Sequence, residues 1–167
     1  MDYKLGKCNR LNLGCGNDYR EGWDNADLYA KKADLRFDFE KAPYPIKDNT
    51  YDHIHCSQVL EHLRCPEVAM MEIYRILKPG GTAEIMVPHY TTSGDWNFRH
   101  KSHFSTAAIY DFIQGHEAQN EAAIKCGGAF KLISASKKMR VLHIDVESRY
   151  LDFIPIWSSI RWVIGKY

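Results

Sequence analysis

The chain has 167 residues, of which 22 are basic and 21 acidic, and its formal net charge is +1. A chain of this length buries roughly two thirds of the surface that its unfolded form exposes, which is enough for one domain without disulfide bonds. The balanced charge gives no global field of the kind that attracts nucleic acid or an anionic membrane, and it favours a small neutral or mixed-charge partner.

The cysteines and the first residues favour a reduced, cytoplasmic protein. The five cysteines are an odd number, and no two of them have the two-residue spacing of common zinc motifs. The opening MDYKLGKCNR lacks an apolar signal region, and no run of about 18 apolar residues predicts a membrane span. Since no repeat or linker divides the chain, we expect a single domain over residues 1–167.

Short apolar segments alternate with a helical pattern in the first half of the chain. Apolar residues recur at helical spacing from Pro66 to Leu77, and the KPGG that follows ends this helix because proline cannot continue it. Such alternation predicts an α/β fold with a mostly parallel sheet and helices on both faces. The expected parallel strands cover residues 10–14, 22–28, 34–39, 51–57 and 81–88.

Three further segments are predicted in the second half. A second helix is expected to begin near Ser105, a suitable N-cap, and to continue through TAAIYDFI. The segment AFKLISASKKMRVLHIDV predicts two strands around Lys137 and Lys138 that form a closing antiparallel hairpin. The C-terminal RYLDFIPIWSSIRWVIGKY is rich in aromatic and aliphatic residues. We expect it to pack on the sheet, with a homodimer contact or a membrane surface as the alternatives.

A glycine turn, RLNLGCGN at residues 10–17, follows the first predicted strand. Ligands of parallel sheets lie beyond the carboxyl ends of the strands, where Gly14 would allow a sharp turn and Gly16 a close approach to the backbone. A plain strand-to-helix bend is the alternative. A dinucleotide fits poorly, because Tyr19 stands where G-x-G-x-x-G requires its third glycine. Asp27 also follows Gly16 much sooner than the roughly 20 residues usual for the acid that binds a dinucleotide.

Two acidic residues end the next predicted strands. Asp27 ends the second, where a carboxylate can accept hydrogen bonds from ribose hydroxyls. Asp38 ends the third, where it can accept from an adenine amino group, and Phe39 beside it can lie against the ring. A solvated turn aspartate and a core aromatic residue are the alternatives. Together the glycine turn and the two acids predict an adenosine ligand.

These features continue into a pattern that resembles class I S-adenosylmethionine-dependent methyltransferases, in particular a compact subgroup similar to type 11 methyltransferase domains. The resemblance is carried in order by LNLGCGN, Asp27, Asp38, NTYDHIHCSQVLEHL at 49–63 and EIYRILKPGGTAEIMVP at 72–88. It implies a Rossmann-like fold, a shortened first crossover, and S-adenosylmethionine as cofactor with S-adenosylhomocysteine as product. The family often has an acid where this chain has Asn12. The implied cofactor-binding residues are Asn12, Gly14, Cys15, Gly16, Asn17, Asp27, Leu28, Asp38, Phe39, Ser57, Glu61 and His62.

The segment VPHYTTSGDWNFRHKSHFS at 87–105 collects polar and aromatic residues just past the last parallel strand. Methyl transfer requires an aligned nucleophile, and histidine is suited to removing a hydroxyl proton near neutral pH. We therefore predict His100, His103 and Asp95 as catalytic, with His100 favoured as the base and Asp95 as its partner. No metal is expected; a three-ligand site made by His100 and His103 with His89 or Asp95 is an alternative, as is a loop of merely polar residues. The predicted acceptor-binding residues are His89, Tyr90, Trp96 and Arg99.

The expected function is methyl transfer to a small polar molecule, with O-methylation of a sugar or related metabolite as the specific hypothesis. One alternative is a subunit or regulator that binds S-adenosylmethionine without turnover. Another is a nicotinamide-dependent oxidoreductase, which Tyr19 and the early Asp27 disfavour. We expect no nucleic-acid partner.

Overall fold

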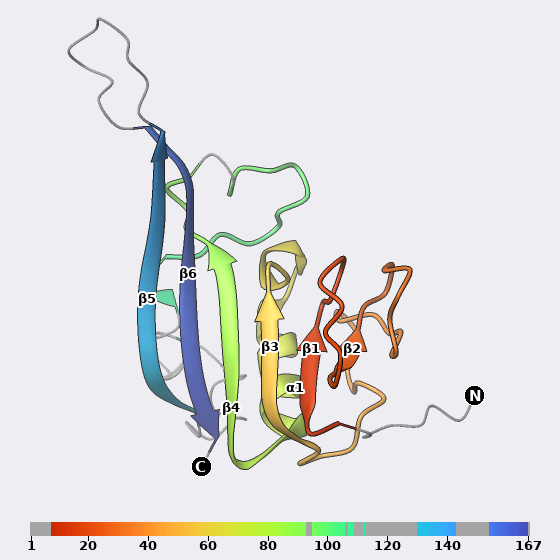
Figure 1. Ribbon diagram of the computed structural model, residues 1–167. Helices are drawn as coiled ribbons and strands as arrows, with labels where there is room; N and C mark the ends of the chain where they lie inside the picture. The colour runs from red at the N-terminus through yellow and green to blue at the C-terminus, as the bar shows by residue number, and fades with distance from the viewer. Residues whose placement is uncertain are drawn as a thin grey trace, which may run out of the picture.

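The computed structural model describes residues 8–92, 95–105, 107–108, 112, 130–142 and 154–166. Within these residues six strands form one sheet in the order β2-β1-β3-β4-β6-β5 (Figure 1). The strands are β1 Arg10–Leu13, β2 Asp24–Ala26, β3 Tyr51–Ser57, β4 Leu77–Pro88, β5 Phe130–Leu142 and β6 Ile154–Lys166. The first four strands are parallel, and β6 is antiparallel to both of its neighbours, β4 and β5. The predicted mostly parallel α/β sheet is confirmed.

The parallel strands bring three loops to one edge of the sheet. In Figure 1 the arrowheads of β1, β3 and β4 all point to the upper edge. The loops that follow these strands begin at Gly14, Gln58 and His89. Because ligands of parallel sheets bind beyond the carboxyl ends of the strands, we expect the predicted site residues at this edge.

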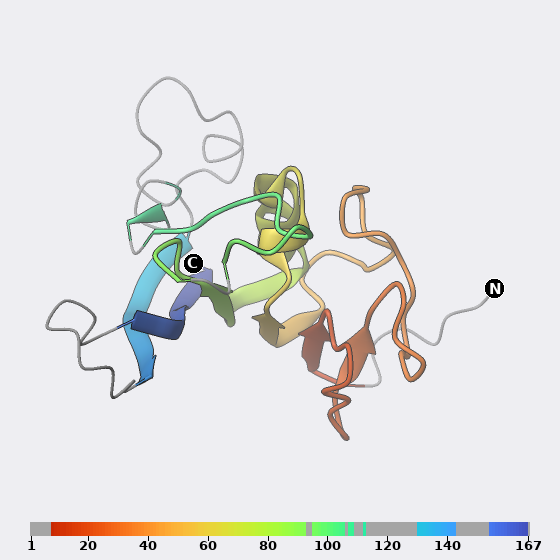
Figure 2. The same cartoon turned by 90° about the horizontal axis from the view of Figure 1, so that it is seen from above.

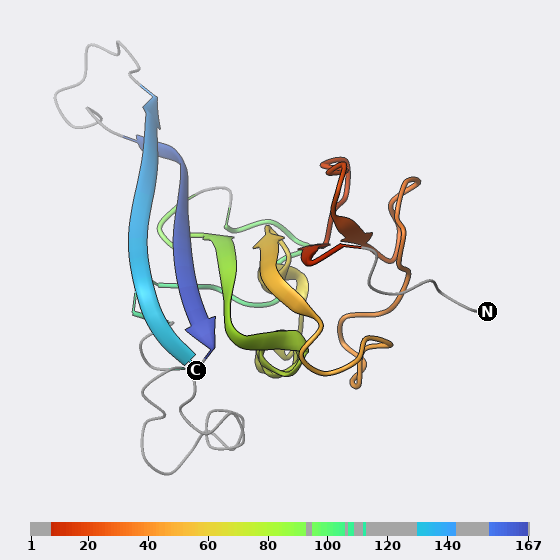
Figure 3. The same ribbon diagram turned by 60° about the horizontal axis from the view of Figure 1, so that its bottom comes forward.

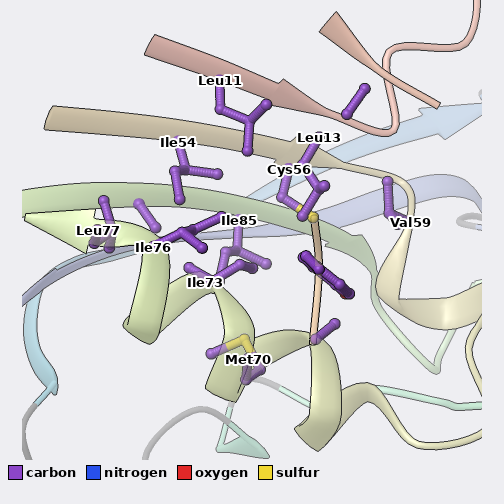
Figure 4. Packing of buried hydrophobic residues seen from close by; sticks show 14 of the residues in the cluster. Leu11, Leu13, Ile54, Cys56, Val59, Met70, Ile73, Ile76, Leu77 and Ile85 are labelled. Atoms are coloured by element: carbon purple, nitrogen blue, oxygen red, sulfur yellow. The ribbon is translucent and has the colours of Figure 1, made fainter. Parts of the chain in front are cut away.

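The helix α1, Pro66–Ile76, packs on one face of the sheet, as Figures 2 and 4 show. Pro66 occupies its first turn, where the missing N–H costs no hydrogen bond. Residues at helical spacing face the sheet, and each buried apolar side chain contributes about 1.5–3 kcal/mol. The core between helix and sheet includes Leu11, Leu13, Ile54, Cys56, Met70, Ile73, Ile76, Leu77 and Ile85.

The opposite face of the central strands is polar. Side chains alternate along β3, so His53 and His55 alternate with the core residues Ile54 and Cys56 and point to the other side. The His53 ring meets Trp23 edge-on at 5.6 Å. No helix of the described residues covers this face (Figure 3). The predicted helices on both faces are thus seen on one, and the helix expected from Ser105 lies almost entirely outside the described residues.

Two expected elements differ in the structure. Residues 34–39 form no strand; only Leu35 makes a bridge, to Ala26. The aromatic rings of Phe37 and Phe39, which follow, pack on one another and on Tyr44. The predicted hairpin at Lys137 and Lys138 is wrong, because both residues lie inside the single strand β5. Tight hairpin turns require residues that adopt a positive φ, such as glycine or asparagine, and lysine is not such a residue. The antiparallel partner of β5 is instead β6, from the C-terminal segment.

The apolar C-terminal segment is therefore built into the sheet. Ile164 on β6 is fully buried in the core, and the Lys166 ammonium group donates to the Leu77 carbonyl oxygen at 2.9 Å. No helix in the described part of the chain is both long enough and apolar enough to cross a membrane.

Candidate active site

The two glycines of the first turn have different surroundings. Gly14 has φ +77°, and a Cβ placed on it would collide with the Val59 side chain from the loop after β3. Its N–H donates to the Ala26 carbonyl oxygen at 2.8 Å. Gly16 has φ +49°, and a Cβ placed there would meet no atom within 4 Å. Gly14 is thus required for packing, while Gly16 borders open space in which a ligand can approach the backbone.

Asp27 is tied to the same turn. Its Oδ2 accepts a hydrogen bond from the Gly16 N–H at 2.9 Å, and its Oδ1 accepts from the N–H groups of Tyr29 and Ala30 at 2.7 and 2.9 Å. Burial raises the pKa of Asp27, but these three backbone donors outweigh it and hold the pKa below its ordinary value. Oδ1 is saturated, whereas Oδ2 keeps a lone pair for a ligand hydroxyl. Leu28, next to it, is partly exposed.

Side-chain amides hold the short connection between β1 and β2. Buried Asn12 donates to the Asp18 carbonyl oxygen at 2.6 Å and to Asn25 Oδ1 at 3.1 Å. The Asn25 amide in turn donates to the carbonyl oxygens of Arg20 and Trp23 at 2.9 and 3.0 Å. No helix intervenes between these strands, which confirms the shortened crossover. Asn12 therefore stabilises the loop between β1 and β2. The sequence, which shows only a polar residue at this position, does not distinguish this role from contact with the cofactor.

The remaining residues predicted at this end divide between the core and the surface. Cys15 is buried, and burial raises its pKa. Asn17 is exposed. Asp38 accepts from the Glu40 N–H at 3.0 Å, and the half-buried Phe39 ring packs 5.1 Å from Phe37.

The loop after β3 contributes a buried carboxyl. Ser57 ends the strand, and the short helix η1, Leu60–His62, follows. Glu61 is 0% exposed, and neither of its carboxylate oxygens has a hydrogen-bond partner in the described part of the chain. Burial, with the nearby Asp95, raises the pKa of Glu61 to about 7. His62 Nδ1 lies 3.3 Å from the Arg99 carbonyl oxygen, and burial lowers the pKa of His62.

The histidine-rich loop after β4 is docked on η1. The Glu61 carbonyl oxygen accepts from the N–H groups of Lys101 and Ser102 at 2.7 and 3.2 Å. The Ser102 hydroxyl donates to the Leu63 carbonyl oxygen at 2.9 Å. These bonds fix the second half of the loop beside the buried Glu61.

Within this loop Asp95 contacts two histidines in different ways. Asp95 is 0% exposed, and its Oδ2 accepts from His103 Nδ1 at 2.6 Å. His100 Nδ1 donates to the Asp95 backbone carbonyl oxygen at 2.9 Å and is 3.8 Å from the carboxylate. The carboxylate is therefore hydrogen-bonded to His103, while His100, the partner that the sequence favoured, is bonded to the Asp95 backbone. Because a carboxylate accepts from Nδ1, the neutral His103 ring carries its lone pair on Nε2. Trp96 stacks on this ring at 4.6 Å.

The predicted acceptor-binding residues are mostly exposed. Tyr90 and Trp96 are 47% and 69% exposed, and Arg99 is exposed as well. His89 is instead buried, with Nδ1 2.7 Å from the Thr91 hydroxyl. Sequence reasoning missed Phe98, which is fully exposed, although an aromatic residue in a polar loop was an available signal.

The chain was compared with known proteins. Residues 15–85 match the family model described as a methyltransferase domain. From the glycine turn to β4, the chain is thus similar to methyltransferase domains. A segment of 41 residues is 49% identical to an uncharacterised methyltransferase of Schizosaccharomyces pombe, covering 25% of this chain and 14% of the relative. Another of 80 residues is 36% identical to a sterol 24-C-methyltransferase of Saccharomyces cerevisiae, covering 45% of this chain and 20% of that protein.

The fold of the chain is shared with solved structures of methyltransferases. A SAM-dependent methyltransferase from Archaeoglobus fulgidus superposes with a TM-score of 0.60 at 15% identity, covering 96% of this chain and 87% of that chain. The family match and the shared fold confirm the predicted resemblance to methyltransferase domains. The chain spans a fifth or less of the length of the two curated relatives. The roles of individual site residues remain predictions.

Proposed function

We propose that this chain is a class I, S-adenosylmethionine-dependent methyltransferase that transfers a methyl group to a hydroxyl of a small polar molecule, such as a sugar. The observation that carries the proposal is the Asp95–His103 pair, with its 2.6 Å hydrogen bond, on the loop after β4. That loop starts at the same sheet edge as the glycine turn after β1. A base and a cofactor-binding turn at one edge are what transfer to a hydroxyl requires.

The residues at the turn fit the cofactor. The open side of Gly16 admits a ligand close to the backbone, and Asp27 offers the free lone pair of Oδ2 to a ribose hydroxyl. A charge-assisted bond of this kind contributes about 1.5–3 kcal/mol. When bound, S-adenosylmethionine supplies a methyl group on a positively charged sulfur. The turn and Asp27 thus have the task of holding the nucleoside end so that this methyl faces the acceptor.

His103 is placed to take the acceptor proton. Its side chain is 38% exposed, so a substrate can reach it, while its carboxylate partner is fully buried. The buried carboxylate fixes the ring through Nδ1 and stabilises the imidazolium formed when Nε2 accepts a proton. The acceptor oxygen, relieved of its proton, is the nucleophile.

The surroundings of His103 support a sugar-like acceptor. Tyr90, Trp96 and Phe98 expose large parts of their rings on one loop, where the Trp96 indole N–H donates to the Tyr90 carbonyl oxygen at 3.0 Å. Flat apolar rings next to a histidine suit a molecule that has a C–H face and several hydroxyls. Exposed Arg99 adds a donor for an anionic substituent.

Calorimetric titration with S-adenosylhomocysteine, and separately with NADH, tests the cofactor half of the proposal. We expect only the former to bind, and Asp27→Ala to weaken its binding by roughly tenfold or more. Asp52→Ala is the matched control, since Asp52 is the second residue of β3 and pairs with Lys78 at 2.7 Å. Binding of NADH alone, or of neither molecule, would overturn the proposal.

Transfer of a labelled methyl group from S-adenosylmethionine to a panel of sugars and polyols tests the catalytic half. We expect a hydroxyl-bearing acceptor to become labelled. Tight binding of S-adenosylhomocysteine without transfer to any acceptor of the panel would contradict an O-methyltransferase of small molecules. That result would favour the alternative, a subunit that binds the cofactor without turnover.

A further inference from the structure

Glu61, His62 and His100 bring three potential metal ligands together where the histidine-rich loop meets η1. One ligand atom from each side chain lies within 4.8 Å of the other two. The rings of His62 and His100 are 4.8 Å apart and almost perpendicular. Opposite ligands on one ion are separated by about 4.2 Å, twice a typical metal–nitrogen distance. Small side-chain rotations would therefore bring the three ligand atoms within coordination distance of one ion.

The Glu61 carboxyl needs a partner that the described residues do not provide. It is 0% exposed, and both of its oxygens lack a hydrogen-bond partner there. The Lys101 ammonium group pairs with Glu40 at 3.1 Å instead. Buried carboxylates are usually paired with a cation or coordinate a metal, because an isolated buried charge is costly. An ion between Glu61 and the two histidines would satisfy this requirement.

Both histidines are oriented as metal ligands usually are. A carbonyl oxygen accepts a hydrogen bond from Nδ1 in each ring: that of Arg99 at 3.3 Å for His62, and that of Asp95 at 2.9 Å for His100. Since a carbonyl can only accept, Nδ1 carries the proton and Nε2 carries the lone pair in the neutral ring. Such a hydrogen bond on the far nitrogen fixes ring orientation and increases ligand basicity at metal sites.

We propose that Glu61, His62 and His100 bind one divalent transition-metal ion, of the manganese or zinc class, and that this ion holds the acceptor hydroxyl. Two imidazoles and one carboxylate suit these ions and leave coordination positions for water or substrate. The role for the ion rests on the proposed function, whereas the binding site itself does not. Asp95 connects the site to the base, because its backbone oxygen holds His100 and its carboxylate holds His103.

Titration of the chelator-treated full chain with Mn²⁺, followed by electron paramagnetic resonance of the free ion, tests the site directly. Mn²⁺ is the probe because the exposed Cys65 thiol favours softer ions. We expect one ion per chain, and roughly tenfold or greater loss of affinity in His62→Ala and His100→Ala. The matched control is His53→Gln, whose imidazole bonds to Thr82 on the polar face of the sheet and whose loss should leave binding unchanged.

Glu61→Gln keeps the inference testable if a histidine variant unfolds, since it preserves volume and replaces only a carboxylate oxygen. We expect it to remain folded by circular dichroism and to bind Mn²⁺ at least tenfold more weakly. A wild-type chain that binds no Mn²⁺ at millimolar concentration overturns the site. Equal binding by the wild-type chain and the three cluster variants overturns it too.

The metal-binding and cofactor-binding experiments distinguish failure of the metal site from failure of the proposed function. Mn²⁺ binding is measured without S-adenosylmethionine, and S-adenosylhomocysteine binding without metal. Methyl transfer that continues undiminished in chelator, with no ion bound, would refute the role of the ion in holding the acceptor and leave the proposed function standing. Mn²⁺ binding that depends on the cluster, without any binding of S-adenosylhomocysteine, would refute the proposed function and leave the site standing.

Discussion

At the scale of single residues, the two glycines of the first turn predict opposite outcomes for one substitution. Gly14→Ala places a methyl group against Val59 at a positive φ, so we expect the free energy of unfolding to fall by about 1–3 kcal/mol. Gly16→Ala meets open space at φ +49°, and should cost only about 1 kcal/mol. Its methyl group would instead fill the space of the ligand, so S-adenosylhomocysteine should bind more weakly while the fold is kept.

Urea unfolding and calorimetry of both variants check this pair of expectations. A Gly16→Ala protein that binds S-adenosylhomocysteine as the wild-type chain does would show that the cofactor does not approach this turn. A Gly14→Ala protein of unchanged stability would show that Val59 moves aside at no cost.

The sequence identified both glycines as candidates for the cofactor site, but it did not distinguish the packing role of Gly14 from the open position of Gly16. Their spacing is the same in any glycine turn, and the collision partner Val59 belongs to a loop that only the folded sheet brings near. The contacts of Asp95 were undecided in the sequence for a similar reason. Spacing allowed either His100 or His103 as its partner, and the path of the loop gave its carboxylate to His103. Residue identity thus indicated the candidates, and tertiary contacts decided their pairing.

At the scale of elements, prediction succeeded where the signal was local. The strand Tyr51–Ser57 and the helix Pro66–Ile76 agree with their apolar periods and with the proline at the helix start. It failed where the signal lay in a distant partner. β5 looks like a hairpin when read alone, but its neighbour β6 comes from the C-terminal segment, and no local pattern encodes that pairing.

The histidine-rich loop acts as one element, docked on η1 and holding the proposed base, His103, by a buried carboxylate. We expect His103→Gln to reduce methyl transfer by roughly 10²–10⁴-fold, the usual contribution of a general base, with S-adenosylhomocysteine affinity unchanged. Asp95→Asn should also lower the rate, because an amide does not stabilise the imidazolium. Single-turnover assays and calorimetry provide the two measurements. Lys101→Met, on the same loop but paired with Glu40, is the control. Full activity in His103→Gln would remove this base from the mechanism.

At the scale of the whole molecule, the central strands of the sheet have one apolar face under α1 and one polar face whose charges respond to pH. His55 lies on the polar face but is only 6% exposed. Its Nε2 accepts from the Arg20 guanidinium at 2.9 Å, since that group can only donate. Burial, together with Arg20, lowers the pKa of His55 below its ordinary 6.5. His55 is therefore protonated less readily in the folded protein than in the unfolded chain.

The sign of the resulting pH dependence follows from linkage. Above pH 6.5 the His55 ring is neutral in both states, so its protonation does not lower the free energy of unfolding. As the pH falls below that value the unfolded chain binds more protons, so the free energy of unfolding decreases, by at most about 1.4 kcal/mol per pH unit for one group. We expect His55→Gln, whose side-chain oxygen can still accept from Arg20, to flatten this part of the urea-unfolding profile. If the wild-type and variant curves differ only by a constant offset across this range, His55 does not titrate between the two states as inferred.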